Sequence, residues 1–238
     1  MEKVLFKDLG AIDYKKAWDY QQSLLDEMVL TKRGNRGLDA SHADWKKQQH
    51  YLLFCEHNPV YTLGKSGSLD HLLLNEKELN DKQIDFYKIN RGGDITFHGK
   101  GQIVGYPLFD LDCFFNDVHK YVRFLEEAVI RTISEYGLTG IRKEGFTGVW
   151  LEKTASQPYR KICAIGVHLS RWVTMHGFAF NVNTDLDYFN YIVPCGINDQ
   201  DKEVTSLKKE LNETIDIEQV KERLKYHFSE LFGLVFAD

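Results

Sequence analysis

The residues best suited to chemistry are a cysteine at a forced turn and a lysine upstream of it. Cys195 lies between Pro194 and Gly196, and proline fixes φ while glycine tolerates strained backbone angles. This turn presents the thiol at a corner of the backbone. A thiolate is the nucleophilic form of cysteine, and a nearby ammonium group lowers the thiol pKa. Lys161, 34 residues upstream, is the candidate for that group, so the pair predicts acyl transfer through a thioester.

The predicted reaction needs neither a cofactor nor a metal. A thioester donor is already activated, so its acyl group can move to an amine without ATP, given a nucleophile, a proton shuttle and a dry pocket. As a cation, Lys161 favours the thiolate, and once neutral it can accept a proton from the incoming amine. His50, Cys55 and His57 lie near one another in the sequence. On a strand, however, residue 50 faces away from residues 55 and 57, so a zinc site is not expected.

A glycine-rich segment offers a second candidate for ligand contact. Residues 91–102 contain four glycines, which allow close backbone approach and leave amide groups available to oxygen atoms. The spacing matches neither the dinucleotide-binding GxGxxG motif nor the phosphate-binding P-loop. The glycines alone favour a pair of tight hairpin turns. His98, within the segment, is interpreted in two ways: it orients the substrate or polarises the dyad, or it is a hydrogen-bonded structural histidine.

Composition excludes several classes of protein. The 238 residues are 43% hydrophobic and 27% charged, as in soluble globular proteins, and the absence of a Ser/Gly-rich linker predicts one domain over residues 1–238. No apolar run reaches signal-peptide or membrane-spanning length, so a cytoplasmic protein is expected. The net charge of −5 argues against nucleic-acid binding through bulk charge. Cys55, Cys113 and Cys163 are expected as small buried hydrophobes in a reducing compartment.

Hydrophobic periodicity predicts three long helices at residues 14–31, 116–136 and 217–231. We expect Asn116 to cap the second helix, and we place Tyr226 on the mostly apolar face of the third. Seven segments have strand-like patterns: residues 4–9, 51–55, 60–63, 86–89, 148–151, 162–170 and 177–182. Strands that cluster between few helices, without regular βαβ alternation, predict an α+β fold.

Six short motifs between residues 54 and 207 resemble, in order, those of the lipoyl(octanoyl) transferases. They comprise residues 56–64 (EHNPVYTLG), 91–102 with Tyr106-Pro107, 147–150 (TGVW), 161–166 (KICAIG), 176–179 (HGFA), and 193–197 (VPCGI) followed by 204–207 (VTSL). Lys161 and Cys195 also have the separation found in that family. Two positions depart from the family pattern: Lys100, where proline is frequent, and Cys163, where a small residue such as alanine is usual.

The resemblance implies a mixed-sheet α+β domain flanked by helices, similar to the catalytic domain of biotin and lipoate protein ligases. It also implies octanoyl transfer from octanoyl-acyl carrier protein to a lipoyl-domain lysine of 2-oxoacid dehydrogenase E2 subunits or glycine cleavage H protein. Cys195 would carry the acyl group and Lys161 would lower its pKa, in a monomer that binds no nucleic acid or membrane. The implied substrate contacts are Arg91, Gly92, Gly93, Asp94, Ile95, Thr96, Phe97, His98, Ala164, Ile165, Gly166, Gly177, Phe178 and Ala179.

Three other functions compete with this interpretation. A lipoate–protein ligase of similar fold would activate a free acid with ATP and usually has no catalytic cysteine. A thioesterase would use water in place of the lysine acceptor, and a non-catalytic acyl-protein binding module would not need the dyad. The basic residues between Lys32 and Lys47 are expected to be a solvated loop. The alternative is that they dock the acidic carrier protein.

Overall fold

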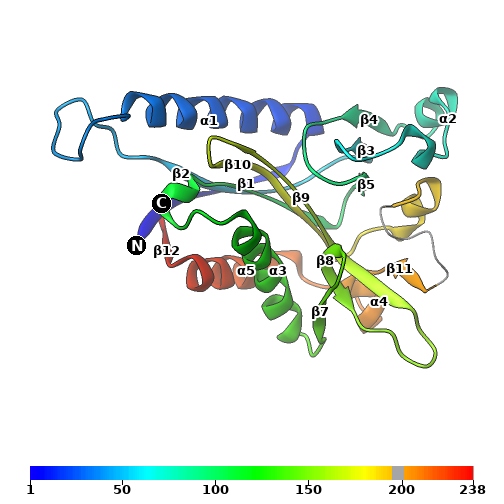
Figure 1. The fold of residues 1–238 in the computed structure, drawn as a ribbon. Coiled ribbons are helices and arrows are strands. Elements are labelled where there is room, and N and C mark those ends of the chain that lie inside the picture. The colour runs from blue at the N-terminus through cyan, green and yellow to red at the C-terminus, as the bar shows by residue number, and fades with distance from the viewer. Residues whose placement is uncertain (195–200, 238) are drawn as a thin grey trace.

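A mixed β-sheet organises the protein. The computed structural model describes residues 1–194 and 201–237, and within them nine strands form a sheet in the order β12-β1-β2-β6-β10-β9-β8-β7, with β11 beside β9 (Figure 1). The pairs β1–β12, β1–β2 and β9–β11 are parallel, and the other pairs are antiparallel. The strands are β1 (Glu2–Ala11), β2 (His50–Glu56), β6 (Gln102–Leu108), β7 (Gly140–Lys143), β8 (Phe146–Leu151), β9 (Tyr159–Ser170), β10 (Val173–Asn181), β11 (Lys202–Val204) and β12 (Leu234–Ala237).

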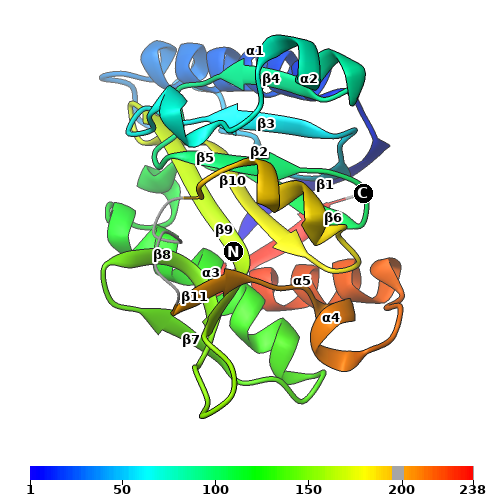
Figure 2. The same cartoon turned by 90° about the vertical axis from the view of Figure 1, so that its right-hand side faces the viewer.

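A second, three-stranded sheet lies beside the start of the first helix. Its order is β4-β3-β5, and it continues the layer that α1 forms over the main sheet (Figure 2). The strands are β3 (Val60–Leu63), β4 (Asp85–Lys88) and β5 (Ile95–His98). The glycine-rich segment 91–102 runs from the loop between β4 and β5 through β5 to the start of β6, so the small sheet holds the first part of this segment against the main sheet.

Helices cover both faces of the main sheet. Helix α1 (Tyr14–Gly34) buries a stripe that includes Leu24 and Met28 against β2, β6 and β10, while α3 (Val118–Ser134) and α5 (Ile217–Phe232) pack on the opposite face (Figure 1). The remaining helical elements are short: α2 (Glu76–Asp81), α4 (Leu207–Leu211) and the 3-10 turns η1 (Leu69–His71), η2 (Leu111–Cys113) and η3 (Leu186–Tyr191). The predicted α+β fold, a mixed sheet flanked by helices, is confirmed.

Three local predictions were wrong. Asp117, and not Asn116, caps α3, because its carboxylate accepts the Lys120 amide at 2.9 Å. Cys113 is exposed, because in the 3-10 turn η2 the side chain that packs into the core is that of Leu111, two residues earlier. Tyr226 is 59% exposed, because the buried stripe of α5 passes through Leu224 and Phe228 instead.

Strand β6 is fully buried at the centre of the sheet, yet the sequence did not predict it. Gly105 and Pro107 lie within it, and both residue types weaken a strand pattern. Strand β10 pairs with β6 only as far as Gly105, whereas β2 continues past Pro107. Pro107 therefore lies where β6 is paired in register with a strand on one side only, although β10 stays close on the other side, where the Thr174 hydroxyl donates to the Pro107 carbonyl at 2.8 Å.

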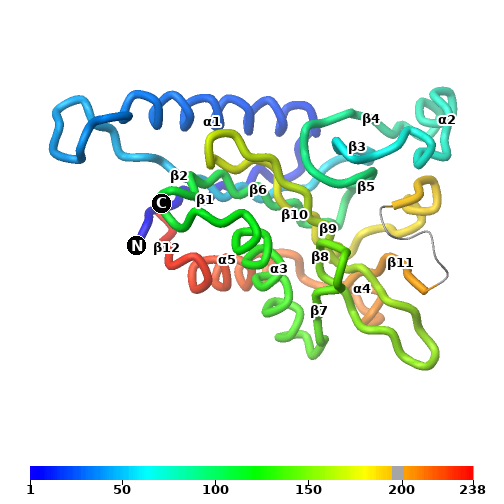
Figure 3. The backbone as a smooth tube through the Cα atoms, in the orientation of Figure 1, coloured from blue at the N-terminus to red at the C-terminus, as the bar shows by residue number. Residues whose placement is uncertain are grey.

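The two ends of the described chain lie at one edge of the sheet. Residues of β1 from Glu2 to Leu5 pair in parallel with residues of β12 from Leu234 to Ala237 (Figure 3). The first and last strands thus pair with each other at one edge of the main sheet. Among the helices described, none combines the length and the apolar character needed to cross a membrane.

The helical layer of α3 and α5 depends on aromatic packing around Phe228. Its ring stacks on Phe178 at 5.7 Å and on Phe232 at 5.6 Å between centroids. Phe228→Ala should lower the free energy of unfolding by roughly 3–5 kcal/mol, because it removes buried area and leaves a cavity. Tyr226→Ala, on the exposed face of the same helix, is the matched control and should cost much less. Urea denaturation of both variants measures the difference, and equal losses would contradict the assigned faces of α5.

Candidate active site

A cavity of about 460 Å³ lies between the main sheet and the segment that carries the small sheet. Strands β5, β6, β9 and β10 contribute to its walls, together with the first two turns of α3, the turn between β7 and β8, and the start of β8. All the predicted substrate contacts except Phe97 line it: Arg91, Gly92, Gly93, Asp94, Ile95, Thr96, His98, Ala164, Ile165, Gly166, Gly177, Phe178 and Ala179. The fold therefore brings together residues that are far apart in the sequence.

Phe97 packs elsewhere. Its ring stacks on Tyr188 with centroids 4.6 Å apart and contacts Phe189 at 5.6 Å. In a strand, successive side chains point to opposite faces, so Phe97 belongs to the apolar cluster beneath the small sheet while its neighbours in β5 line the cavity.

Small residues from two neighbouring strands form one wall of the cavity. Ala164 pairs with Ala179, and Gly166 pairs with Gly177, across the antiparallel β9–β10 ladder. A strip without large side chains leaves room above the sheet. Because these residues come from segments more than ten positions apart, only the strand register creates the strip.

The glycine-rich segment docks on this strip. The Gly92 amide donates to the Val167 carbonyl at 2.9 Å. A Cβ on Gly166 would lie 2.8 Å from the Gly92 oxygen and 3.0 Å from Cδ of Arg91, closer than side chains tolerate. The expectation of two hairpin turns was therefore wrong for residues 91–93, which form a loop held against β9.

Arg91 and His98 fix the geometry of the cavity wall through buried hydrogen bonds. The Arg91 guanidinium donates to the Thr62 carbonyl at 2.7 Å and to the Gly92 carbonyl at 2.9 Å. His98 Nδ1 lies 2.9 Å from the Gln102 side-chain oxygen, so this nitrogen donates and Nε2 is left as an acceptor. His98 is thus both hydrogen-bonded and part of the cavity lining, and its role in substrate contact stays a prediction.

Two buried histidines of the cavity, His98 and His176, are neutral at physiological pH. Burial, with a smaller effect from the charge of Arg91, lowers the pKa of His176 to about 3. Burial also lowers the pKa of His98 well below its usual value, with further effects from His57 and Arg91. His176 bonds Asn90 at 2.8 Å and has a φ of 60°, a conformation that costs free energy for a non-glycine residue.

Several lining residues were not predicted as contacts. His176 lies in a motif that the sequence did supply. Gln102, Tyr106 and Thr147 also lie in such motifs. The others gave no local signal, because they come from the start of α1, from the unpredicted strand β6, from the first two turns of α3, from the turn before β8 and from the start of β8: Tyr14, Val104, Val118, His119, Val122, Arg123, Gly145 and Phe146.

A β-bulge accompanies the placement of Lys161 at the cavity. Val149 pairs with Cys163 but Trp150 pairs with Lys161, so Ile162 is the extra residue in β9. Ile162 is buried in the core, whereas Lys161 lines the cavity with its Nζ 4.9 Å from the centroid of the Trp150 ring. The prediction that this lysine projects inward is confirmed.

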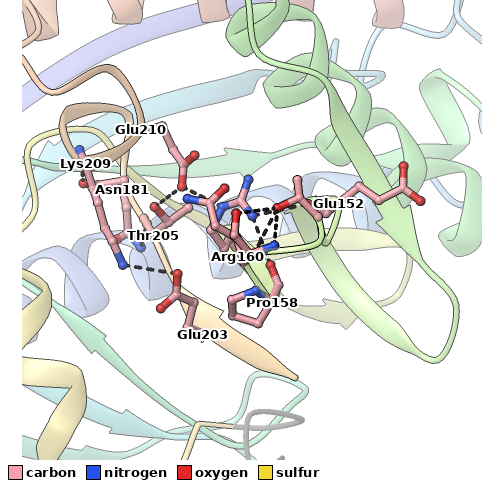
Figure 4. Close-up of polar contacts among 12 residues, drawn as sticks. Glu152, Pro158, Arg160, Asn181, Glu203, Thr205, Lys209 and Glu210 are labelled. Atoms are coloured by element: carbon pink, nitrogen blue, oxygen red, sulfur yellow. Dashed lines mark hydrogen bonds and ion pairs between the residues drawn. The ribbon is translucent and has the colours of Figure 1, made fainter. Parts of the chain in front are cut away.

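A buried ion pair holds β11 next to Lys161. Arg160 donates to Glu210 at 2.9 Å, and the same carboxylate oxygen accepts the Thr205 hydroxyl at 2.6 Å (Figure 4). The Thr205 amide in turn donates to the Lys161 carbonyl at 2.9 Å. The backbone of Lys161 is therefore fixed on one side by β8 and on the other by β11.

The chain also reaches the cavity just before the predicted nucleophile. The Val193 amide donates to the His71 carbonyl at 2.8 Å, and the His71 side chain is paired with Asp94 of the cavity wall. Pro194 is itself a lining residue. Cys195 and Gly196 lie outside the described residues, so the predicted Cys195–Lys161 contact stays a prediction.

No metal cluster accompanies this site in the described ranges. There, no group of three or more histidine, cysteine, aspartate or glutamate side chains could hold an ion. His57 Nδ1 lies 2.8 Å from the Ile12 carbonyl, and its Nε2 lies 2.8 Å from the Tyr106 hydroxyl. The hydrogen bonds of His57 thus account for both of its ring nitrogens.

Comparisons with known proteins give the family of this chain. The octanoyltransferase of Cytophaga hutchinsonii is 52% identical over 98% of this chain and 94% of its own length. The octanoyltransferase of Christiangramia forsetii is 56% identical over 97% and 96%, respectively. This chain belongs to the octanoyltransferase family. The model of the lipoyl protein ligase A/B catalytic domain also matches it, over residues 13–229.

Solved structures of the ligase branch share the fold. A lipoate-protein ligase A bound with ATP superposes with a TM-score of 0.66 at 17% identity, over 100% of this chain and 88% of that one. A putative lipoate protein ligase from T. acidophilum with bound lipoic acid gives 0.64 at 16% identity, with the same coverage. At such identities the likeness shows the fold alone. An octanoyltransferase is an acyltransferase, and its cavity is the candidate active site.

The Arg160–Glu210 pair should be needed for the stability of this region. Glu210→Ala leaves the Arg160 guanidinium buried without its carboxylate, which should cost roughly 3–5 kcal/mol. Glu203 forms an exposed pair with Lys209 at 3.3 Å, so Glu203→Ala is the matched control and should cost below ~1 kcal/mol. Chemical denaturation of both variants checks this prediction, and a small loss for Glu210→Ala would show that the pair does not hold β11.

Proposed function

We propose that this protein transfers octanoyl from octanoyl-acyl carrier protein to a lysine of a lipoyl domain, through a thioester on Cys195. Curated octanoyltransferases at 47–56% identity over nearly the whole chain support the octanoyl group as substrate. The observation that carries the proposal is that Lys161 and Pro194 line one cavity. The residue before Cys195 and its proposed partner thus face a common space.

The proposed reaction has two acyl-transfer steps. The Cys195 thiolate attacks the carbonyl carbon of the donor thioester; a new S–C bond forms, the donor S–C bond breaks, and the carrier thiolate leaves with a proton from the Lys161 ammonium, so that Lys161 becomes neutral. The amine of the lipoyl-domain lysine then attacks the acyl-enzyme. An N–C bond forms, the Cys195 S–C bond breaks, and neutral Lys161 accepts the proton that the amine loses.

The small-residue strip suits an apolar acyl chain. Ala164 and Ala179 pair on the strip and leave a slot rather than a filled core. Burial at ~0.8 kcal/mol per methylene gives an octanoyl chain roughly 5 kcal/mol. This amount is large enough to favour octanoyl over much shorter acyl groups and to hold the thioester carbonyl at the Lys161 end of the slot.

The acceptors we propose are the lipoyl domains of 2-oxoacid dehydrogenase E2 subunits and glycine cleavage H protein. Relatedness to lipoate ligases supports them, since one solved archaeal relative is described together with its E2 lipoyl domain. We also propose that residues 1–238 form one catalytic domain. The support is that the first and last strands pair side by side in the same sheet.

The first test is acyl-enzyme formation at Cys195. After incubation with octanoyl-acyl carrier protein, a chelator and no nucleotide, intact-mass spectrometry should show one added octanoyl on the parent protein. Cys195→Ala should show none, because it lacks the nucleophile, whereas Cys113→Ala should be labelled like the parent although it removes an exposed thiol. Persistent labelling of Cys195→Ala would refute the thioester, and an absolute requirement for ATP would favour the ligase function instead.

The second test concerns Lys161. If its ammonium lies within ~4–6 Å of the thiol, it lowers the thiol pKa by one to several units. Lys161→Ala should therefore raise the pH needed to alkylate Cys195 and sharply reduce transfer. Lys161→Arg keeps the charge but cannot accept a proton, so it should retain a reactive thiol and transfer poorly. Parent-like alkylation and turnover in both variants would show that Lys161 has no part in the reaction.

A further inference from the structure

A carboxylate is buried in α3, beside the strand that supports Lys161. The Glu126 side chain has no exposed surface. It accepts the Gly148 amide at 3.0 Å, the Arg123 guanidinium at 2.6 Å and the Arg142 guanidinium at 3.1 Å. Burying an ionised carboxylate is expensive unless charge and hydrogen bonds compensate it. A neutral amide could tie α3 to β8 at lower cost, so the charge itself calls for an explanation.

Gly148 connects this carboxylate to Lys161. It has a φ of +120°, and a Cβ there would lie 3.0 Å from Cε of Lys161 and 2.4 Å from the Cys163 carbonyl. The lysine stem therefore passes directly over a glycine whose amide is held by Glu126. With ordinary bond lengths, these contacts place the carboxylate within ~10 Å of the Lys161 ammonium.

We propose that Glu126 is a positioning residue that fixes Gly148 under the Lys161 stem and, through its negative charge, sets the pH range of the reaction. This inference rests on the proposed function of Lys161. The charge acts on both proposed partners in the same direction, because it favours the ammonium over the amine and the thiol over the thiolate.

The charged and titratable groups around this point come from three elements. Arg123 of α3 and Arg142 of β7 pair with Glu126, while Lys161 and Cys163 lie on β9. Burial raises the pKa of the Cys163 thiol; Lys161 lowers it and Glu126 raises it. The charges of Lys161 and Glu126 therefore both act on the pKa of the same buried thiol, which supports their proximity to each other. The two arginines reduce the effect of Glu126 without cancelling it, since both are partly exposed to solvent.

The experiment compares the pH dependence of kcat/KM for octanoyl transfer in four proteins. Glu126→Gln keeps the shape and the hydrogen bond to Gly148 but loses the charge, so both limbs of the profile should move to lower pH by about half to one unit. Arg142→Gln leaves Glu126 less compensated and should move both limbs to higher pH. Glu127→Gln is the matched control, since Glu127 also pairs with Arg142 but accepts no bond from Gly148.

The outcomes separate this inference from the proposed function. Opposite shifts in Glu126→Gln and Arg142→Gln, with a parent-like profile for Glu127→Gln, would support it. The inference would be overturned if kcat/KM of Glu126→Gln fell at every pH while both limbs stayed at the same pH. A residue with only a structural role changes the rate without moving the limbs. If thermal denaturation shows that Glu126→Gln is unfolded, the Arg142→Gln profile decides the question. A shift of both limbs to higher pH supports the inference, and no shift or a shift to lower pH overturns it. A parent protein without transfer activity would refute the proposed function instead.

Discussion

The structure depends on the close approach of two backbones, that of β9 and that of the loop at residues 91–93. Gly166 has no side chain to keep them apart, and the Gly92 amide reaches the Val167 carbonyl at 2.9 Å. This contact holds the loop against the small-residue strip of alanine and glycine, which the register of β9 with β10 creates. Larger side chains at these positions would fill the space and lift the small sheet away from the main one.

The same strand carries Lys161, the proposed partner of Cys195, and the strands that β9 pairs with differ between Lys161 and the small-residue strip. Before the bulge at Ile162, β9 lies between β8 and β11; beyond it, β9 pairs with β10. The backbone of Lys161 is thus held between β8 and β11, next to the buried Arg160–Glu210 pair, and its side-chain stem lies over Gly148. Rigid support matters here because a lysine side chain is flexible, and its charge helps a thiol only from a fixed short distance.

Much of the fold was predictable from the sequence, but the walls of the site were not. The helices followed from periodicity, and the position of Lys161 followed from an apolar strand that begins beside it. Strand β6 was not predicted because Gly105 and Pro107 interrupt its hydrophobic pattern. The docking of residues 91–93 on β9 was not predicted because glycines fit a hairpin turn equally well. Glu126 gave no signal, since a glutamate in an amphipathic helix is normally solvated. Only the packing of α3 on β8 shows that it is buried.

The cavity therefore has two electrostatically different regions. Val167 and Lys161 lie six residues apart on β9, a separation of ~20 Å along a strand. Near Val167, the guanidinium of Arg91 is turned toward backbone carbonyls, and burial lowers the pKa of His176 to about 3, so this histidine adds no charge at neutral pH. At the other end, Lys161 lies near the buried Glu126 carboxylate, which is paired with Arg123 and Arg142. An acyl thioester has the matching asymmetry: its tail is apolar, and its carbonyl is where charge develops during transfer. This asymmetry supports the orientation that we propose, with the thioester carbonyl at the Lys161 end of the slot.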